Sequence, residues 1–325
     1  MTATPLSILD LAHVESGGSI SEALHHSVEL AKLAERSGYT RMWYAEHHNM
    51  PSIASSATAV LIAHVAAHTS TIGLGAGGVM LPNHSPLVIA EQFGTLAELH
   101  PGRIHLGLGR APGTDGATLR ALRRSYQAAD NFPEDVLELQ RYLADRIPRN
   151  GINAYPGRGT FVPLTILGSS MFGASLAAQL GIPYSFASHF APQHLTGAVA
   201  HYREHYVPSE QHPEPYVSAG VIVVAAATDE AAEELFGRVK LHRVRSFLSR
   251  GRSEELTLEA AASLMETPAA TEILGMLRHT AMGGPEQVRT QLEDFARYAN
   301  VDELVTVHQA PTRAEQLESV RLTAA

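Results

Sequence analysis

Residues 103–115 read Arg-Ile-His-Leu-Gly-Leu-Gly-Arg-Ala-Pro-Gly-Thr-Asp, an apolar run that passes directly into glycine, arginine and proline. Such a run predicts a short buried parallel strand over 104–109 whose C-terminal end opens into a loop. The glycines at 107 and 109 let another backbone or a flat ligand come close. Arg110 offers a planar donor fork suited to phosphate. A tight turn carrying a surface arginine fits this stretch equally well. The choice between the two interpretations depends on the rest of the sequence.

Outward from this stretch, apolar strand patterns alternate with helical patterns along the whole chain. The expected strands cover 6–11, 41–48, 71–82, 104–109, 162–170, 184–189, 216–227 and 303–308. Eight strands, each followed by a helix, favour an α/β fold with a closed (β/α)8 TIM barrel, and we expect one domain over 1–325. The least regular segment, 250–284, is an insertion between strands seven and eight. It is interpreted either as a mobile lid or as two ordinary helices.

Composition excludes several classes of protein. The 325 residues carry a net charge of −9 without charge blocks and contain no cysteine, so a basic nucleic-acid footprint, disulfides and thiolate chemistry are not expected. No signal peptide and no apolar run long enough to span a membrane are recognised. We therefore expect a cytoplasmic protein that binds neither nucleic acid nor membranes.

In such a barrel the functional site lies at the C-terminal ends of the strands. The residues placed there are rich in imidazole, hydroxyl and glycine. Ser169 and Ser170, between the fifth strand and the next helix, predict a phosphate site because hydroxyls and free helix N–H groups would converge there with Arg110. The alternative for these serines is plain N-capping. The same rule selects Gly77, Gly78, Asn83, His189 and His308, the last three as weaker candidates for substrate or lid contacts.

The tripeptide Glu46-His47-His48 ends the second expected strand. Adjacent strand residues face opposite sides, so the two histidines are not expected to bind one metal ion. The motif also lacks the helical i,i+4 spacing of a zinc site. We predict no metal, and an acid/base or substrate-orienting role for these histidines.

Five segments together resemble the bacterial luciferase-like, flavin-dependent monooxygenases. They are Trp43-Tyr-Ala-Glu-His-His48, 75–86 with Gly-Gly-Val-Met-Leu-Pro-Asn-His-Ser-Pro, 100–110, Leu167-Gly-Ser-Ser170 with 177–183, and 282–288. The resemblance extends over nearly the whole chain and is strongest to single-barrel oxidoreductases related to the luciferase alpha chain.

The resemblance implies reduced FMN, supplied by a separate flavin reductase, and O2 as the oxidant. His47 matches the catalytic histidine, and Arg110, Ser169 and Ser170 match positions that hold the FMN phosphate. Gly77-Gly78 matches a non-prolyl cis peptide that lies against the flavin ring. Light-emitting relatives carry a cysteine where this chain has Gly109, so bioluminescence is not expected. An acidic residue at the phosphate is replaced by Ser169.

The resulting hypothesis is a two-component FMN-dependent monooxygenase that acts on a hydrophobic small molecule, such as a polyketide-type natural-product intermediate. One alternative is hydride transfer with deazaflavin F420, which the motifs do not exclude. A second alternative is a non-catalytic luciferase-like subunit, which the retention of His47 and Arg110 disfavours. From the resemblance we also expect a homodimer.

Overall fold

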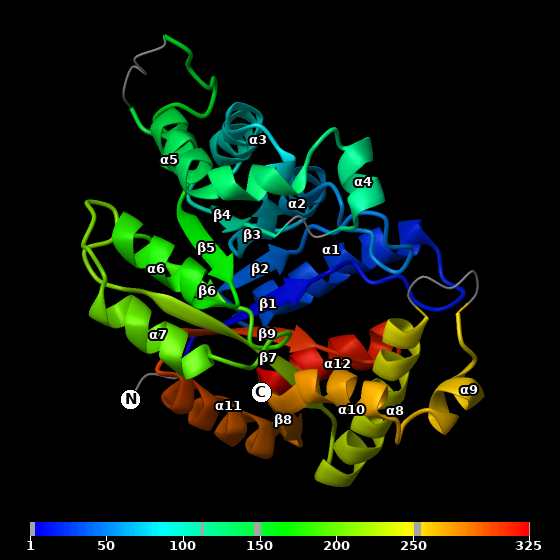
Figure 1. Cartoon of the computed structure of the whole chain (residues 1–325). Helices are drawn as coiled ribbons and strands as arrows, with labels where there is room; N and C mark the ends of the chain where they lie inside the picture. The colour runs from blue at the N-terminus through cyan, green and yellow to red at the C-terminus, as the bar shows by residue number, and fades with distance from the viewer. Residues whose placement is uncertain (1–3, 112–113, 146–150, 250–254, 325) are drawn as a thin grey trace.

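Eight parallel strands close into a barrel in the computed structural model, which describes residues 4–111, 114–145, 151–249 and 255–324 (Figure 1). The strand order is β1-β2-β3-β4-β5-β6-β7-β9, and β9 pairs with β1 to complete the ring. This confirms the predicted (β/α)8 architecture. The barrel strands are β1 (Leu6–Asp10), β2 (Arg41–Tyr44), β3 (Gly73–Met80), β4 (Ile104–Gly109), β5 (Leu164–Gly168), β6 (Tyr184–Phe186), β7 (Val217–Ala225) and β9 (Glu303–His308).

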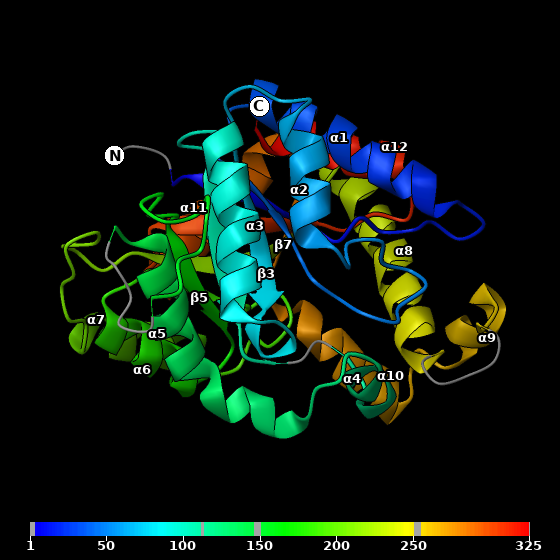
Figure 2. The same ribbon diagram turned by 90° about the horizontal axis from the view of Figure 1, so that it is seen from above.

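Helices connect the strands and cover the outside of the barrel, and Figure 2 shows α1, α2 and α3 in succession along one side. Several begin with a side chain that caps the first turn. Ser19, for example, forms a capping box with Glu22. The helices are α1 (Ile20–Arg36), α2 (Thr58–Ala66), α3 (Pro86–Leu99), α4 (Gly116–Ala121), α5 (Phe132–Leu143), α6 (Met171–Leu180), α7 (Leu195–Glu204), α8 (Asp229–Leu248), α9 (Leu258–Ser263), α10 (Pro268–Gly275), α11 (Pro285–Ala299) and α12 (Arg313–Thr323), with short 3-10 turns η1 (Leu81–Asn83), η2 (Tyr126–Asn131) and η3 (Met276–Arg278).

A ninth strand, β8 (Thr280–Gly283), departs from the prediction, which placed no strand in this segment. It pairs with the second half of β7, from Ile222 to Ala225, on the edge whose first half pairs with β6. Because β7 is nine residues long and β6 only three, the free part of that edge accepts β8. The barrel wall is therefore extended at the C-terminal end of β7.

The segment expected to be either a lid or two ordinary helices is described from residue 255 on. It contains α9 and α10, as the two-helix alternative predicts, and it also contributes β8 to the sheet. Residues 250–254, where the lid was predicted to begin, lie outside the described residues. Its mobility stays a prediction.

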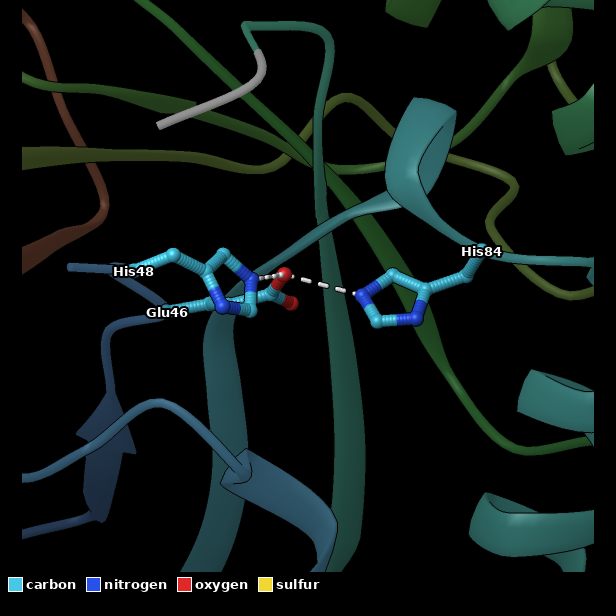
Figure 3. Close-up of side chains that lie close together, drawn as sticks. All are labelled: Glu46, His48 and His84. Atoms are coloured by element: carbon cyan, nitrogen blue, oxygen red, sulfur yellow. Dashed lines mark hydrogen bonds and ion pairs between the residues drawn. The ribbon is translucent and has the colours of Figure 1, made fainter. Parts of the chain in front are cut away.

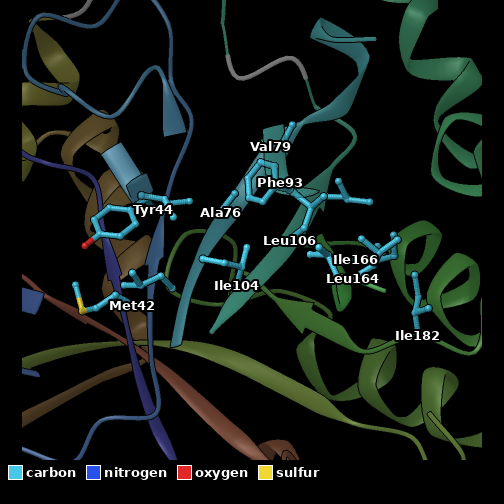
Figure 4. Close-up of a cluster of buried hydrophobic side chains, with 14 of the residues drawn as sticks. Met42, Tyr44, Ala76, Val79, Phe93, Ile104, Leu106, Leu164, Ile166 and Ile182 are labelled. Carbon is cyan, nitrogen blue, oxygen red and sulfur yellow. The ribbon is translucent and has the colours of Figure 1, made fainter. Parts of the chain in front are cut away.

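Alternating strand residues fill two separate cores. Met42 and Tyr44 of β2 face outward, where a large apolar cluster fills the space between sheet and helices and includes Phe93 of α3 (Figure 4). Trp43, between them, faces inward with Leu9 and Val305. The inner cluster is apolar, and the His105 ring lies beside it, with its centroid 6.0 Å from that of the Trp43 ring.

Among the described residues, none of the helices is both long and apolar enough to cross a membrane.

Candidate functional site

The backbone of β3 changes course at Gly77 and Gly78, which are joined by a cis peptide bond, as the resemblance implies. Pairing with β4 slips at the same place, between Ala76 and Val79. A Cβ at Gly77 would lie 2.7 Å from Cβ of Trp43, and one at Gly78 would lie 2.6 Å from the carbonyl oxygen of Gly107. Both contacts are too close for a side chain, so this strand end presents bare backbone.

Arg110 and the start of α6 lie side by side at the ends of β4 and β5, because Gly109 pairs with Leu167. The Arg110 guanidinium stacks on the Phe172 ring, with Cζ 4.2 Å from the ring centroid, and forms no ion pair with the described residues. Ser170 occupies the N-cap position of α6, yet its side chain makes no capping hydrogen bond. The plain-capping alternative therefore fails for Ser170, and this helix N-terminus retains N–H groups that can bind an anion.

Glu46 lies two residues beyond β2 and is almost completely buried, with 1% of its side chain exposed. Its Oε1 lies 2.8 Å from Nε2 of His48 and 2.8 Å from Nε2 of His84 (Figure 3). Its Oε2 accepts the backbone N–H of Met80 at 3.1 Å, and the Asn83 side chain lies 3.5 Å from Oε1. One carboxylate therefore ties the end of β2 to the segment that follows β3.

The Glu46 carboxylate is ionised at neutral pH. Burial alone would raise its pKa, but the hydrogen bonds from His48 and His84 outweigh burial and lower the pKa to about 2. An ionised carboxylate has only acceptor oxygens, so both Nε2 atoms must carry a proton. We call Glu46, His48 and His84 the carboxylate–imidazole cluster.

His47 and His48 do not lie on a strand, contrary to the prediction, because β2 ends at Tyr44 and both residues belong to the following loop. Alternation no longer governs the side chains there. His48 turns back to Glu46, two residues before it. His47 is partly buried in the same loop, and its predicted acid/base role stays a prediction.

Side-chain types alone would also suit the carboxylate–imidazole cluster to a divalent cation, since one atom from each residue lies within 4.8 Å of the others. The two 2.8 Å separations are, however, ordinary hydrogen-bond lengths, and the carboxylate oxygen itself stands between the imidazoles. The arrangement is complete without an ion. The prediction that the site uses no metal is compatible with this geometry and stays a prediction.

His308 does not line the site, contrary to its selection as a strand-end residue. Its Nδ1 lies 2.9 Å from Oγ of Ser319 in α12, and its Nε2 lies 3.1 Å from Oγ1 of Thr306. The side chain thus faces the helix layer, and burial lowers its pKa to about 3.

His189 packs against β7, where the missing side chain of Gly220 makes room for its imidazole. Gly220 pairs with Val305, whose side chain belongs to the inner core, so His189 reaches the barrel interior. Its Nδ1 is buried and has no hydrogen-bond partner within the part of the chain that the structure describes. Burial and the nearby charge of Arg243 lower the pKa of His189 to about 4. The weak assignment of His189 to substrate contacts stays a prediction, on a residue held neutral.

Glu46 and His84 are the residues that the sequence argument missed. Both stand in quoted motifs, Glu-His-His and Asn-His-Ser-Pro, but nothing in either motif indicates that they meet across 38 positions. Their contact depends on the parallel pairing of β2 with β3, which aligns Tyr44 with Ala76.

Comparison with known proteins gives consistent matches. Residues 4–303 match the family model described as luciferase-like monooxygenase. A luciferase-like monooxygenase of Escherichia coli is 45% identical and aligns with 97% of this chain and 95% of its own. The N-acetyl-S-alkylcysteine monooxygenase of Bacillus subtilis is 40% identical over 56% of each chain. The crystal structure of apo-MsnO8 shares 34% identity and superposes with a TM-score of 0.87, covering 99% of this chain and 97% of that one.

Proposed function

Since this chain belongs to the luciferase-like monooxygenase family, we propose that it is a flavin-dependent monooxygenase that uses reduced FMN and O2 to oxygenate a hydrophobic small molecule. The observation that carries the proposal is the convergence of two features at one end of the barrel. Bare backbone at Gly77-Gly78 on β3 lies next to the Arg110–α6 corner, which is formed by the ends of the neighbouring strands β4 and β5. A flat ring that carries a phosphate group would fit both features at once.

The residues present fit FMN. Arg110 would bind the phosphate through its guanidinium, with Ser169, Ser170 and the first N–H groups of α6 as further donors. The bare backbone at Gly77-Gly78 would support the flavin ring. Neither contact requires the acidic residue or the cysteine that the sequence lacks at Ser169 and Gly109.

When bound, reduced FMN would supply the electrons that activate O2. The chain's own residues would hold the flavin, exclude water from the reaction and move protons. In this proposal His47 acts as an acid/base group next to the ring. The reduced flavin comes from a separate reductase, and the active form is a homodimer.

The proposal is tested by anaerobic titration of the purified protein with reduced FMN, and in parallel with reduced F420. Saturable binding of reduced FMN in preference to F420, and oxygen uptake when a flavin reductase and a hydrophobic substrate are added, support the proposal. Preference for F420 together with no oxygen uptake would favour the hydride-transfer alternative. No binding of either cofactor would favour a non-catalytic subunit.

Replacing Arg110 with alanine should weaken the binding of reduced FMN by about 10- to 100-fold, since it removes charge-assisted hydrogen bonds worth about 1.5–3 kcal/mol. Arg297→Ala, at an exposed position on α11, is the matched control and should leave the affinity unchanged. The measurement is the dissociation constant from the same anaerobic titration, with circular dichroism to check the fold. Equal affinities of both variants would place the phosphate elsewhere.

A further inference from the structure

We propose that the carboxylate–imidazole cluster of Glu46, His48 and His84 is a second acid–base site, in which Glu46 holds two histidines ready to accept protons at Nδ1. This inference concerns residues other than His47. It rests on the proposed function only for the identity of the reaction that uses the proton.

The hydrogen bonds to Glu46 determine the tautomer of both imidazoles. Because the ionised Glu46 oxygen only accepts hydrogen bonds, His48 and His84 must each present Nε2–H to it. A neutral imidazole protonated at Nε2 carries its lone pair on Nδ1. The carboxylate therefore decides which nitrogen of each ring is the base, as a carboxylate does when it orients a catalytic histidine.

The Nδ1 atoms of the two imidazoles are accessible, whereas the Glu46 carboxylate is not. Among the described residues, neither His48 Nδ1 nor His84 Nδ1 has a hydrogen-bond partner. The side chains are 17% and 29% exposed, whereas Glu46 is 1% exposed. The cluster thus buries its anion and leaves its two basic nitrogens within reach of water or a ligand. A purely structural brace would have no need of two open acceptors.

The cluster lies close to the backbone proposed to support the flavin. Glu46 Oε2 accepts the N–H of Met80, two residues beyond the Gly77-Gly78 peptide. This places the cluster at the C-terminal end of β3, beside the backbone proposed to support the flavin ring. A proton released or consumed there has a short path to either imidazole.

Other titratable and charged groups lie in the same loop as the cluster and in two segments that contact its neighbours. His47 lies between Glu46 and His48 in the same loop. Arg124 donates from Nε to the carbonyl oxygen of Asn83 at 3.3 Å. Asp115 accepts a hydrogen bond from Asn49 at 3.4 Å. Among these charged groups Glu46 is the one in direct hydrogen-bond contact with both imidazoles, so its charge dominates their orientation.

The proton transfer balances without a further reactant. Nδ1 of His48 or His84 takes a proton from a water or ligand hydroxyl and becomes part of an imidazolium, whose Nε2–H still donates to Glu46. The same nitrogen later returns that proton, and the cluster is regenerated. Glu46 is a positioning residue in this scheme, since it touches no reacting atom.

The first test uses the resting protein without cofactor. Nitrogen-15 NMR of histidine-labelled protein reports which ring nitrogen carries the proton, and single His48→Gln and His84→Gln variants assign the two signals. Both rings should be in the Nε2–H form in the native protein and should become mixed in Glu46→Gln, whose amide both donates and accepts. The signal of His308, buried behind α12, serves as the fold control and should not move.

Either ring in the Nδ1–H form, or tautomers that do not change in Glu46→Gln, would overturn the proposal. So would one equivalent of zinc or iron in the purified protein that disappears in that variant, because a metal would then occupy the Nε2 atoms. None of these readouts depends on flavin or oxygen, so they remain interpretable if the proposed function fails.

The second test applies once oxygenation has been observed. Glu46→Gln should lower kcat about 100-fold with little change in KM, and should shift the acidic limb of the pH–rate profile. Glu46→Asp should recover part of the loss, since it restores the charge. A pH profile and kcat equal to those of the native protein would exclude a role in the reaction even if the tautomers are as expected.

Discussion

Acidification from pH 7 to pH 5 should lower the free energy of unfolding by about 6 kcal/mol, mainly through buried His308 and partly buried His105 and His189. Burial lowers the pKa of His308 to about 3, and burial together with a nearby arginine lowers those of His105 and His189 to about 4. In the unfolded chain each imidazole returns to its ordinary pKa of about 6.5. At pH 5 the unfolded chain is therefore more protonated at each site, which favours unfolding by about 2 kcal/mol per histidine.

The direction of the pKa shifts determines whether stability rises or falls with pH. A folded pKa below the unfolded value means that the stabilising contribution is complete above about pH 6.5. It is lost as the pH falls from there towards the folded pKa values of about 4 and 3. Carboxylates with lowered pKa values, such as Glu46 at about 2, add their own loss only below about pH 4.5. The window between pH 6.5 and 5 is thus a property of the histidines.

Urea unfolding at a series of pH values measures this slope. His308→Gln should reduce the pH-dependent loss between pH 7 and pH 5 by about 2 kcal/mol, since it removes one of the largest protonation steps. Val288→Ala in α11 is the control, because it truncates a buried apolar side chain of another cluster and should lower stability equally at every pH. A free energy of unfolding that stays constant between pH 7 and pH 5 would show that water already reaches these imidazoles in the folded protein.

The barrel was predictable because each of its eight strands is an apolar run bounded by turn residues or helical patterns. β8 was not, because Thr280–Gly283 is only four residues long and has no periodicity of its own. Its existence depends on how far β7 continues beyond β6, and that is a property of the assembled sheet.

The orientation of the His308 side chain could not be predicted from its position at a strand end. In β9 the side chains of Val305 and Val307 fill the barrel, while Thr306 and His308 face α12. The strand Glu-Leu-Val-Thr-Val-His is buried throughout, so its sequence does not reveal which set of alternate residues faces inward. A shift by one residue would have directed His308 into the barrel.

The meeting of Arg110 with the start of α6 was predictable, because it needs only the order of strands and two loop motifs. The carboxylate–imidazole cluster was not, because it depends on where β2 stops. The chain leaves the sheet at Tyr44, and the freed loop then folds Glu46 and His48 toward each other and toward His84. Residue types at strand ends therefore indicate which end of the barrel to consider, while the contacts between side chains depend on the assembled fold.

The N-terminal end of the barrel carries the other prediction with a large effect, because it contains a buried charge. Glu303 of β9 is 1% exposed and pairs with Arg41 of β2, whose side chain is 17% exposed. The carboxylate also accepts hydrogen bonds from Ser7 and from the Tyr216 hydroxyl, the latter at 2.7 Å. Three barrel strands and the residue preceding β7 are thus joined by one side chain.

Replacing Glu303 with leucine should lower the free energy of unfolding by about 3–5 kcal/mol, because the Arg41 guanidinium then stays buried without its partner charge. Glu318→Leu breaks the exposed Arg321–Glu318 pair and should change stability by about 1 kcal/mol or less. The double variant Arg41→Leu/Glu303→Leu should recover much of the loss, since no unpaired charge remains. The measurement is urea unfolding of the native protein, the two single variants and the double variant. If Glu303→Leu loses no more stability than Glu318→Leu, water solvates Arg41 once its partner is gone, and the prediction is wrong.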